Sequence, residues 1–158
     1  TIGWALFDMT NKQLLELTHF TPKLKPKPDG KVEEHLLKAT AFGEKLKELK
    51  GLGVVDVIIE EPLLTSNNLY TVGTLMKYNS MKFAFPTLMR ENDKGRKVLF
   101  GGLPKGCDKK KLIWDEVIKE EPGLVWQYTR NNTLKKECFD MADAYTCVKG
   151  YMSKEGIW

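Results

Sequence analysis

The stretch VVDVIIEEP, at residues 54–62, decides the fold class of this chain. Its run of β-branched residues is typical of a strand that is covered on both faces in a parallel or mixed sheet. We expect this strand at residues 54–59, ending in a pair of acids. Open α/β sheets bind ligands at the carboxyl ends of their strands, so Glu60 is a candidate functional acid at that edge. Glu61 points to the opposite face, because side chains alternate along a strand.

The segments before this strand predict a β-hairpin and a helix. Residues 2–7 and 13–20 are apolar or alternating, and the polar residues between them include Asp8, which we expect to act as a turn former. Apolar residues recur at helical spacing over residues 31–50. The proline-rich residues 21–30 predict an exposed, extended loop, because proline removes backbone donors and restricts its neighbours.

The segments after the strand predict further helices. Ser66 and Asp108 can cap helices at residues 67–78 and 109–120, and a last helix is expected at residues 134–152. Strands precede helices, and no internal repeat is visible. The predicted fold class is therefore α/β, with a central mixed β-sheet flanked by helices.

Composition favours one globular domain over residues 1–158. The chain is 42% hydrophobic and 29% charged, which is enough apolar content for an ordinary core. No window has the apolar length of a membrane span, and the first residues lack the pattern of a signal peptide. We expect a soluble intracellular protein, cytoplasmic or associated with the nucleoid, without a membrane partner.

The cysteines and histidines do not indicate a metal or triad site. Cys107, Cys138 and Cys147 are odd in number and show no CxxC spacing, so neither zinc nor a disulfide framework is indicated. Mostly buried thiols are expected. His19 and His35 have no Ser or Cys nucleophile in a recognisable motif beside them, which argues against triad chemistry.

The net charge of +4 is unevenly spread along the chain. Lysines concentrate at residues 23–31, 94–97, 105–111 and 135–136. Such clusters permit the binding of a polyanion, although many charge runs are simply solvated faces.

Two acids in the last predicted helix form a second candidate site. Asp140 and Asp143 are three residues apart, which places them on one face of a helix. Like charges at this spacing repel, and a bound cation would convert the repulsion into attraction. The small side chains of Ala142 and Ala144 would permit a close approach of helix and sheet. A separate packing stripe is expected at Met141, Tyr145, Val148 and Met152.

Three motifs in this order resemble those of the RuvC-like Holliday-junction resolvases. These enzymes are a branch of the ribonuclease-H-like nucleases. GWAL, at residues 3–6, resembles the stretch that follows the family's first catalytic Asp. VIIEEP, at residues 57–62, resembles the strand with the catalytic Glu, and DMADAY, at residues 140–145, resembles the terminal D-x-x-D-A helix. The resemblance spans nearly the whole chain and implies a ribonuclease-H-like fold.

The resemblance also implies an activity. Glu60, Asp140 and Asp143 would be ligands of Mg²⁺, for which Mn²⁺ could substitute, because carboxylate oxygens suit hard divalent cations. Two such ions would support hydrolysis of a phosphodiester bond without a covalent enzyme intermediate. Lys109 is expected to contact the substrate near this site.

Four-way branched DNA is the substrate that the resemblance implies, and a homodimer is expected because such a junction offers paired cleavage positions. Lysines at the start of the helix at residues 109–120 follow a Gly-rich loop, where ammonium groups and backbone donors could bind phosphate. The predicted DNA-binding residues are Lys82, Lys105, Lys109, Lys110, Lys111, Asn67 and Asn68.

The chain departs from the family pattern at two places. The family carries an Asp on a strand before its Gly-Trp-Ala-Leu equivalent, and Asp8 does not replace it because it lies at the hairpin turn. The passage at residues 77–86 is too short for the central strand that this fold needs. We hypothesise that the sequence lacks the first strand and an internal stretch near residues 79–80. Two alternatives stay open: a junction-binding module with impaired catalysis, and another ribonuclease-H-like nuclease that acts on flaps or RNA–DNA hybrids.

Overall fold

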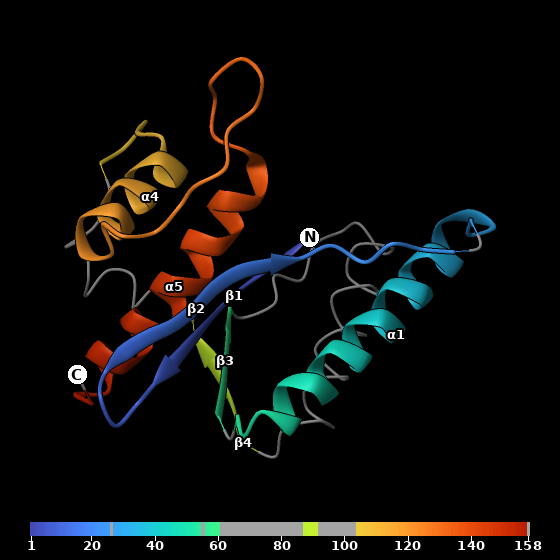
Figure 1. The fold of residues 1–158 in the computed structure, drawn as a ribbon, viewed down its shortest axis with the longest axis horizontal. Helices are drawn as coiled ribbons and strands as arrows, with labels where there is room; N and C mark the ends of the chain where they lie inside the picture. The colour runs from blue at the N-terminus through green and yellow to red at the C-terminus, as the bar shows by residue number, and fades with distance from the viewer. Residues whose placement is uncertain (26, 55, 61–86, 92–103, 158) are drawn as a thin grey trace. The chain divides into compact units, whose positions relative to one another are not determined.

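The computed structural model describes residues 1–25, 27–54, 56–60, 87–91 and 104–157 (Figure 1). The chain divides into two compact units, which are described one at a time. The first unit comprises Thr1–Thr21 and Glu91–Trp158, and the second comprises Pro22–Arg90. The described residues form a mixed α/β structure, as the sequence predicts.

The first unit begins with the predicted β-hairpin. Strand β1 (Ile2–Asp8) pairs antiparallel with β2 (Gln13–Phe20). The register runs from Ile2 opposite Phe20 to Asp8 opposite Gln13, and it shifts between Leu6 and Phe7. Because side chains alternate along a strand, Gly3, Ala5 and Phe7 lie on a common face of β1.

The turn of this hairpin is organised by Asp8, which confirms its predicted role. The Asp8 carboxylate accepts hydrogen bonds from the side-chain amide of Asn11 at 2.6 Å and from the backbone N–H of Thr10 at 2.8 Å. These hydrogen bonds, first that of the Asn11 side chain, lower the pKa of Asp8 below its ordinary value. Lys12 completes the turn with a φ of 55°.

Two helices complete the described part of the first unit. Helix α4 (Lys109–Glu120) begins after Asp108, whose side chain accepts a hydrogen bond from the backbone N–H of Lys111 at 3.2 Å, as predicted for a cap. Helix α5 (Lys136–Lys154) begins later than the predicted residue 134. The reason is that Leu134 forms an isolated antiparallel bridge with Tyr128.

The core of the first unit lies where α5 meets both the hairpin and α4. Val117 and Ala142 are each 1% exposed and Tyr145 is 2% exposed. Partly buried apolar side chains from both strands and from α4 and the loop after it surround this cluster: Ala5, Phe7, Leu14, Leu17, Trp114, Leu124 and Trp126. Helix α5 is therefore the element on which the hairpin and α4 both pack.

The predicted packing stripe of α5 is only partly correct. Tyr145 and Met152 are buried, whereas Met141 and Val148 are partly exposed. Residues outside the predicted stripe are buried instead: Cys138, Ala142, Thr146, Cys147 and Gly150. The difference arises because α5 is contacted from two directions, by the hairpin and by α4, so its buried surface is wider than one stripe.

The second unit contains helix α1 (Gly30–Gly51), at the position that the sequence predicts. Its buried residues are Ala39, Phe42 and Leu46, at helical spacing. Strand β3 (Asp56–Glu60) is hydrogen-bonded to β4 (Thr87–Glu91) in a two-stranded sheet. The strand was predicted to start at residue 54 and to be covered on both faces, but residues 57–59 are partly exposed.

Several expectations concern residues that the structure does not describe. The helix predicted at residues 67–78 and the passage near residues 79–80 lie outside the described residues. Strand β4 follows this passage and was not predicted from the sequence. Among the described helices, none has the length and apolar content that crossing a membrane would require.

Candidate functional site

The contact between Gly3 and α5 determines where the acidic pair of α5 lies in the first unit. A Cβ atom built on Gly3 would lie 2.2 Å from the backbone oxygen of Asp140 and 2.7 Å from the backbone nitrogen of Met141. These distances are well inside van der Waals contact, so only glycine fits at this point of β1. The strand backbone and the helix backbone therefore meet directly at Asp140.

The side chains of β1 that pack on α5 increase in size along the strand. Gly3 meets Asp140 without a side chain, Ala5 contributes a methyl group to the core, and the ring of Phe7 lies 5.3 Å from that of Tyr145. The strand and helix backbones are thus in direct contact at Gly3, and a phenyl ring lies between them at Phe7.

Asp140 and Asp143 are both partly buried on α5, and their spacing places them on neighbouring positions of one helix face. Within the described part of the chain, the Asp140 carboxylate has no hydrogen bond or ion pair. The backbone oxygen of Asp143 accepts a hydrogen bond from the Thr146 hydroxyl at 3.1 Å. The structure thus brings these two predicted site residues together.

The donor set of this pair fits a hard divalent cation in part. Two carboxylates supply up to four oxygen atoms, whereas Mg²⁺ prefers six oxygen ligands, some of which are usually water. No group of three or more His, Cys, Asp or Glu residues that could hold a metal occurs among the described residues. The third predicted ligand, Glu60, is the last residue of β3 in the second unit, and its side chain lies outside the described part of the structure.

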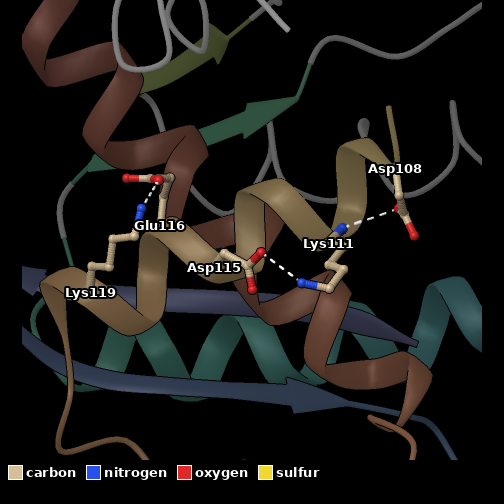
Figure 2. A network of polar contacts seen from close by, with 5 residues as sticks. All are labelled: Asp108, Lys111, Asp115, Glu116 and Lys119. Carbon is tan, nitrogen blue, oxygen red and sulfur yellow. Dashed lines mark hydrogen bonds and ion pairs between the residues drawn. The ribbon is translucent and has the colours of Figure 1, made fainter. Parts of the chain in front are cut away.

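Helix α4 begins with the predicted phosphate-binding lysines. Lys105, Lys109 and Lys110 are exposed, and Gly106 turns the chain ahead of the helix with a φ of 77°. Lys111 differs from them, because its ammonium group forms an ion pair with Asp115 at 2.8 Å, one turn further along α4 (Figure 2). Lys111 is therefore a weaker candidate for phosphate than its neighbours.

The other predicted DNA contacts are not placed by the structure. Asn67, Asn68 and Lys82 lie outside the described residues. Of the predicted catalytic residues, Lys109 is exposed in the first turn of α4 and makes no ion pair within the described ranges.

A polar cluster around Tyr145, which was not predicted from the sequence, fastens α4 to α5. The Tyr145 hydroxyl lies 2.9 Å from a carboxylate oxygen of Glu120 and 3.1 Å from one of Glu121. The Lys149 ammonium group lies 2.7 Å from Glu120. Burial, followed by the acceptor Glu120, raises the pKa of Tyr145 far above its ordinary value, so the phenol keeps its proton and acts as a donor.

Glu120→Gln is expected to destabilise the protein in a pH-dependent manner. Burial alone would raise the pKa of Glu120, but hydrogen bonds from Lys149 and Tyr145 outweigh it and lower this pKa below its ordinary value of 4.5. A carboxyl whose pKa is lower in the folded state contributes stability above its unfolded pKa, and loses it as the pH falls through the folded pKa. The difference in free energy of unfolding between wild type and variant should be constant at about pH 5 to 7 and shrink below about pH 4.5.

Urea unfolding at a series of pH values measures this difference directly. A difference that stays constant down to about pH 3 would contradict the role of the Glu120 carboxylate, because ionisation would then make no contribution.

The described geometry provides two adjacent carboxylates held by a helix that is locked against a strand, with exposed lysines at the start of a second helix in the same unit. Carboxylates suit a divalent cation, and lysines suit phosphate groups. No protein-family model, curated protein or solved structure matches the chain.

Proposed function

We propose that this protein is a metal-dependent, structure-selective endonuclease that resolves four-way DNA junctions by hydrolysing phosphodiester bonds, on a ribonuclease-H-like fold of the RuvC-like type. One observation carries the proposal. The glycine of the GWAL stretch and the first aspartate of the DMADAY stretch, from opposite ends of the chain, meet at the Gly3–Asp140 contact. This convergence supports the resemblance, because its motifs belong to one site only if they meet in space.

The chemistry requires acidic groups that stay in place while a phosphate is cleaved. Asp140 and Asp143 would hold Mg²⁺ or Mn²⁺, and the bound cation would supply Lewis-acid activation of water and of the leaving oxygen. The helix backbone fixes the spacing of the two aspartates, and the Gly3 contact fixes their position along β1. Lys109 would bind the scissile phosphate or its neighbour through its ammonium group.

The charge distribution supports a nucleic-acid substrate. The net charge is +4, and Lys105, Lys109 and Lys110 are exposed at the start of α4. Lysine contacts to phosphate add affinity without reading the sequence, and junction selectivity can come from DNA shape. A homodimer would present two acidic sites to the two related strands of a junction.

Cleavage of a matched substrate panel tests this proposal. The full chain, with its intact mass verified, is assayed with a four-way junction, a flap, an RNA–DNA hybrid and a linear duplex of related sequence. We expect symmetric cleavage of the junction in Mg²⁺ or Mn²⁺, binding without cleavage in Ca²⁺, and little cleavage of the linear duplex.

The other outcomes assign the protein differently. Junction binding with no cleavage in either Mg²⁺ or Mn²⁺ would make it a junction-binding module. Preferential cleavage of the flap or the hybrid would make it another ribonuclease-H-like nuclease. Analytical ultracentrifugation of the protein with and without the junction tests the proposed homodimer.

A further inference from the structure

A short β-hairpin that was not predicted from the sequence lies between α4 and α5. Gln127 and Lys135 form its base, with the Lys135 N–H donating to the Gln127 carbonyl at 2.9 Å, and Tyr128 bridges to Leu134. We call residues 127–135 the tip hairpin. Figure 1 shows this loop projecting beyond the start of α5.

The turn of the tip hairpin is cross-linked by several hydrogen bonds. The Thr129 N–H donates to the Thr133 carbonyl at 2.7 Å, and the two threonine hydroxyls lie 2.7 Å apart. The N–H groups of Asn131 and Thr133 both donate to the Thr129 hydroxyl at 3.3 Å. Asn132 adopts a φ of 57°, which asparagine tolerates better than most residues. The turn is therefore held in one shape before any partner binds.

The turn of the tip hairpin keeps this shape although its residues are not buried in the core. Residues 127–133 are all exposed, and Leu134 is the partly buried residue at the base. Val125 and Tyr128, beside and within the hairpin, are 90% and 47% exposed. Trp126 anchors the segment to the unit by packing edge-on against Trp114, with ring centroids 5.9 Å apart. An anchored projection with an exposed tip is placed where it can contact a partner outside the unit.

The charge of this segment indicates what it contacts. Between Glu121 and Glu137 the sequence contains no acid, and its charged residues are Arg130, Lys135 and Lys136. The other residues at the tip are Thr and Asn, which can donate to phosphate oxygens. Arg130 is exposed, and its guanidinium forms no hydrogen bond or ion pair with the described residues. An aromatic ring, a planar cation and polar donors on one projection match a nucleic acid.

We propose that the tip hairpin is a DNA-contacting element, in which Arg130 binds a backbone phosphate and Tyr128 packs on a base or sugar at the branch point. This inference rests on the proposed function for its choice of substrate, and it adds a contact that lies outside the acidic site. The guanidinium binds phosphate through two parallel N–H donors. The preformed turn lowers the entropic cost of ordering the contact.

Arg130→Glu tests the proposal through binding. Fluorescence anisotropy with a labelled four-way junction in Ca²⁺ should show affinity about tenfold weaker than wild type. The slope of log affinity against log salt should fall by about 1, since one phosphate contact is lost. Arg130→Lys keeps the charge but loses the two parallel N–H donors, so its affinity should lie between those of wild type and Arg130→Glu. The matched control is Lys50→Glu, which makes the same change of net charge at an exposed residue of α1 and should leave affinity within about twofold.

The outcomes separate this inference from the proposed function. Equal affinity of wild type and Arg130→Glu for the junction overturns the inference, including the case in which the hairpin serves a protein partner. Junction cleavage by wild type in that case would leave the proposed function standing. If wild type binds the junction without cleaving it, while Arg130→Glu binds more weakly, the hairpin contact is supported and the nuclease assignment fails. Equal losses in Arg130→Glu and Lys50→Glu would show a general charge effect and would also overturn the inference.

Discussion

Asp143→Asn is expected to lower the rate of junction cleavage at least about 10³-fold while leaving junction binding in Ca²⁺ within about threefold of wild type. The substitution preserves the shape of the side chain and removes its negative charge. If Asp143 shares a divalent cation with Asp140, the loss of one carboxylate weakens the binding of that cation. Affinity for the DNA backbone depends on basic residues, so it should be retained. Single-turnover cleavage and anisotropy measure the two quantities separately.

Asp115→Asn is the matched control for this variant. Asp115 is also an aspartate on a helix of the first unit, and its carboxylate is engaged with Lys111 in an ion pair on α4 (Figure 2). Exposed ion pairs of this kind contribute little to stability, so this control should cleave at the rate of wild type. Cleavage by Asp143→Asn at the wild-type rate would remove the acidic pair of α5 from the mechanism.

Gly3→Ala is expected to destabilise the first unit by about 3 kcal/mol, a large effect for the addition of one methyl group. The added Cβ would lie 2.2 Å from the backbone oxygen of Asp140. The added Cβ is fixed to the strand backbone, and the atoms that it meets belong to the helix backbone. Neither can rotate away as a flexible side chain would, so α5 must move away from the hairpin. Urea unfolding followed by tryptophan fluorescence measures the loss, since Trp4, Trp114 and Trp126 belong to this unit.

Gly123→Ala makes the same chemical change elsewhere in the first unit. A Cβ atom at Gly123 would have no heavy atom within 4 Å, and its φ is not in the left-handed region. Alanine there should raise stability by about 0.5 kcal/mol, because it restricts the unfolded chain. If both variants have the stability of wild type, the close approach of β1 and α5 is absent in solution. If Gly3→Ala is destabilised as expected, it should also lose junction cleavage, because the aspartates move with the helix.

Local patterns in the sequence were sufficient to predict most described elements. The hairpin of β1 and β2, the helix at residues 30–51 and the Asp108 cap each follow from residues close together in the chain. Cys138 and Cys147 are buried and Cys107 is partly exposed, as expected of mostly buried thiols. These features depend on periodicity, turn chemistry and capping, which act within a few residues.

Features that depend on contacts between distant segments were not predictable in the same way. The role of Gly3 depends on where α5 crosses β1, and a lone strand glycine does not reveal its neighbour. The partners of Tyr145 lie at the end of α4, so no spacing within α5 indicates them. The tip hairpin was missed because its paired segments are very short and Leu134 also suits the start of a helix.

The absence of a side chain at Gly3 fixes the register of β1 against α5 in the first unit. A slip of one residue in β1 would present Ile2 or Trp4 to the helix backbone, where there is room for a hydrogen atom alone. The register of β1 and the position of α5 on the hairpin are thus determined by the same contact. An insertion next to Gly3 in β1 would place a side chain against the helix backbone and displace the acids of α5 from the strand.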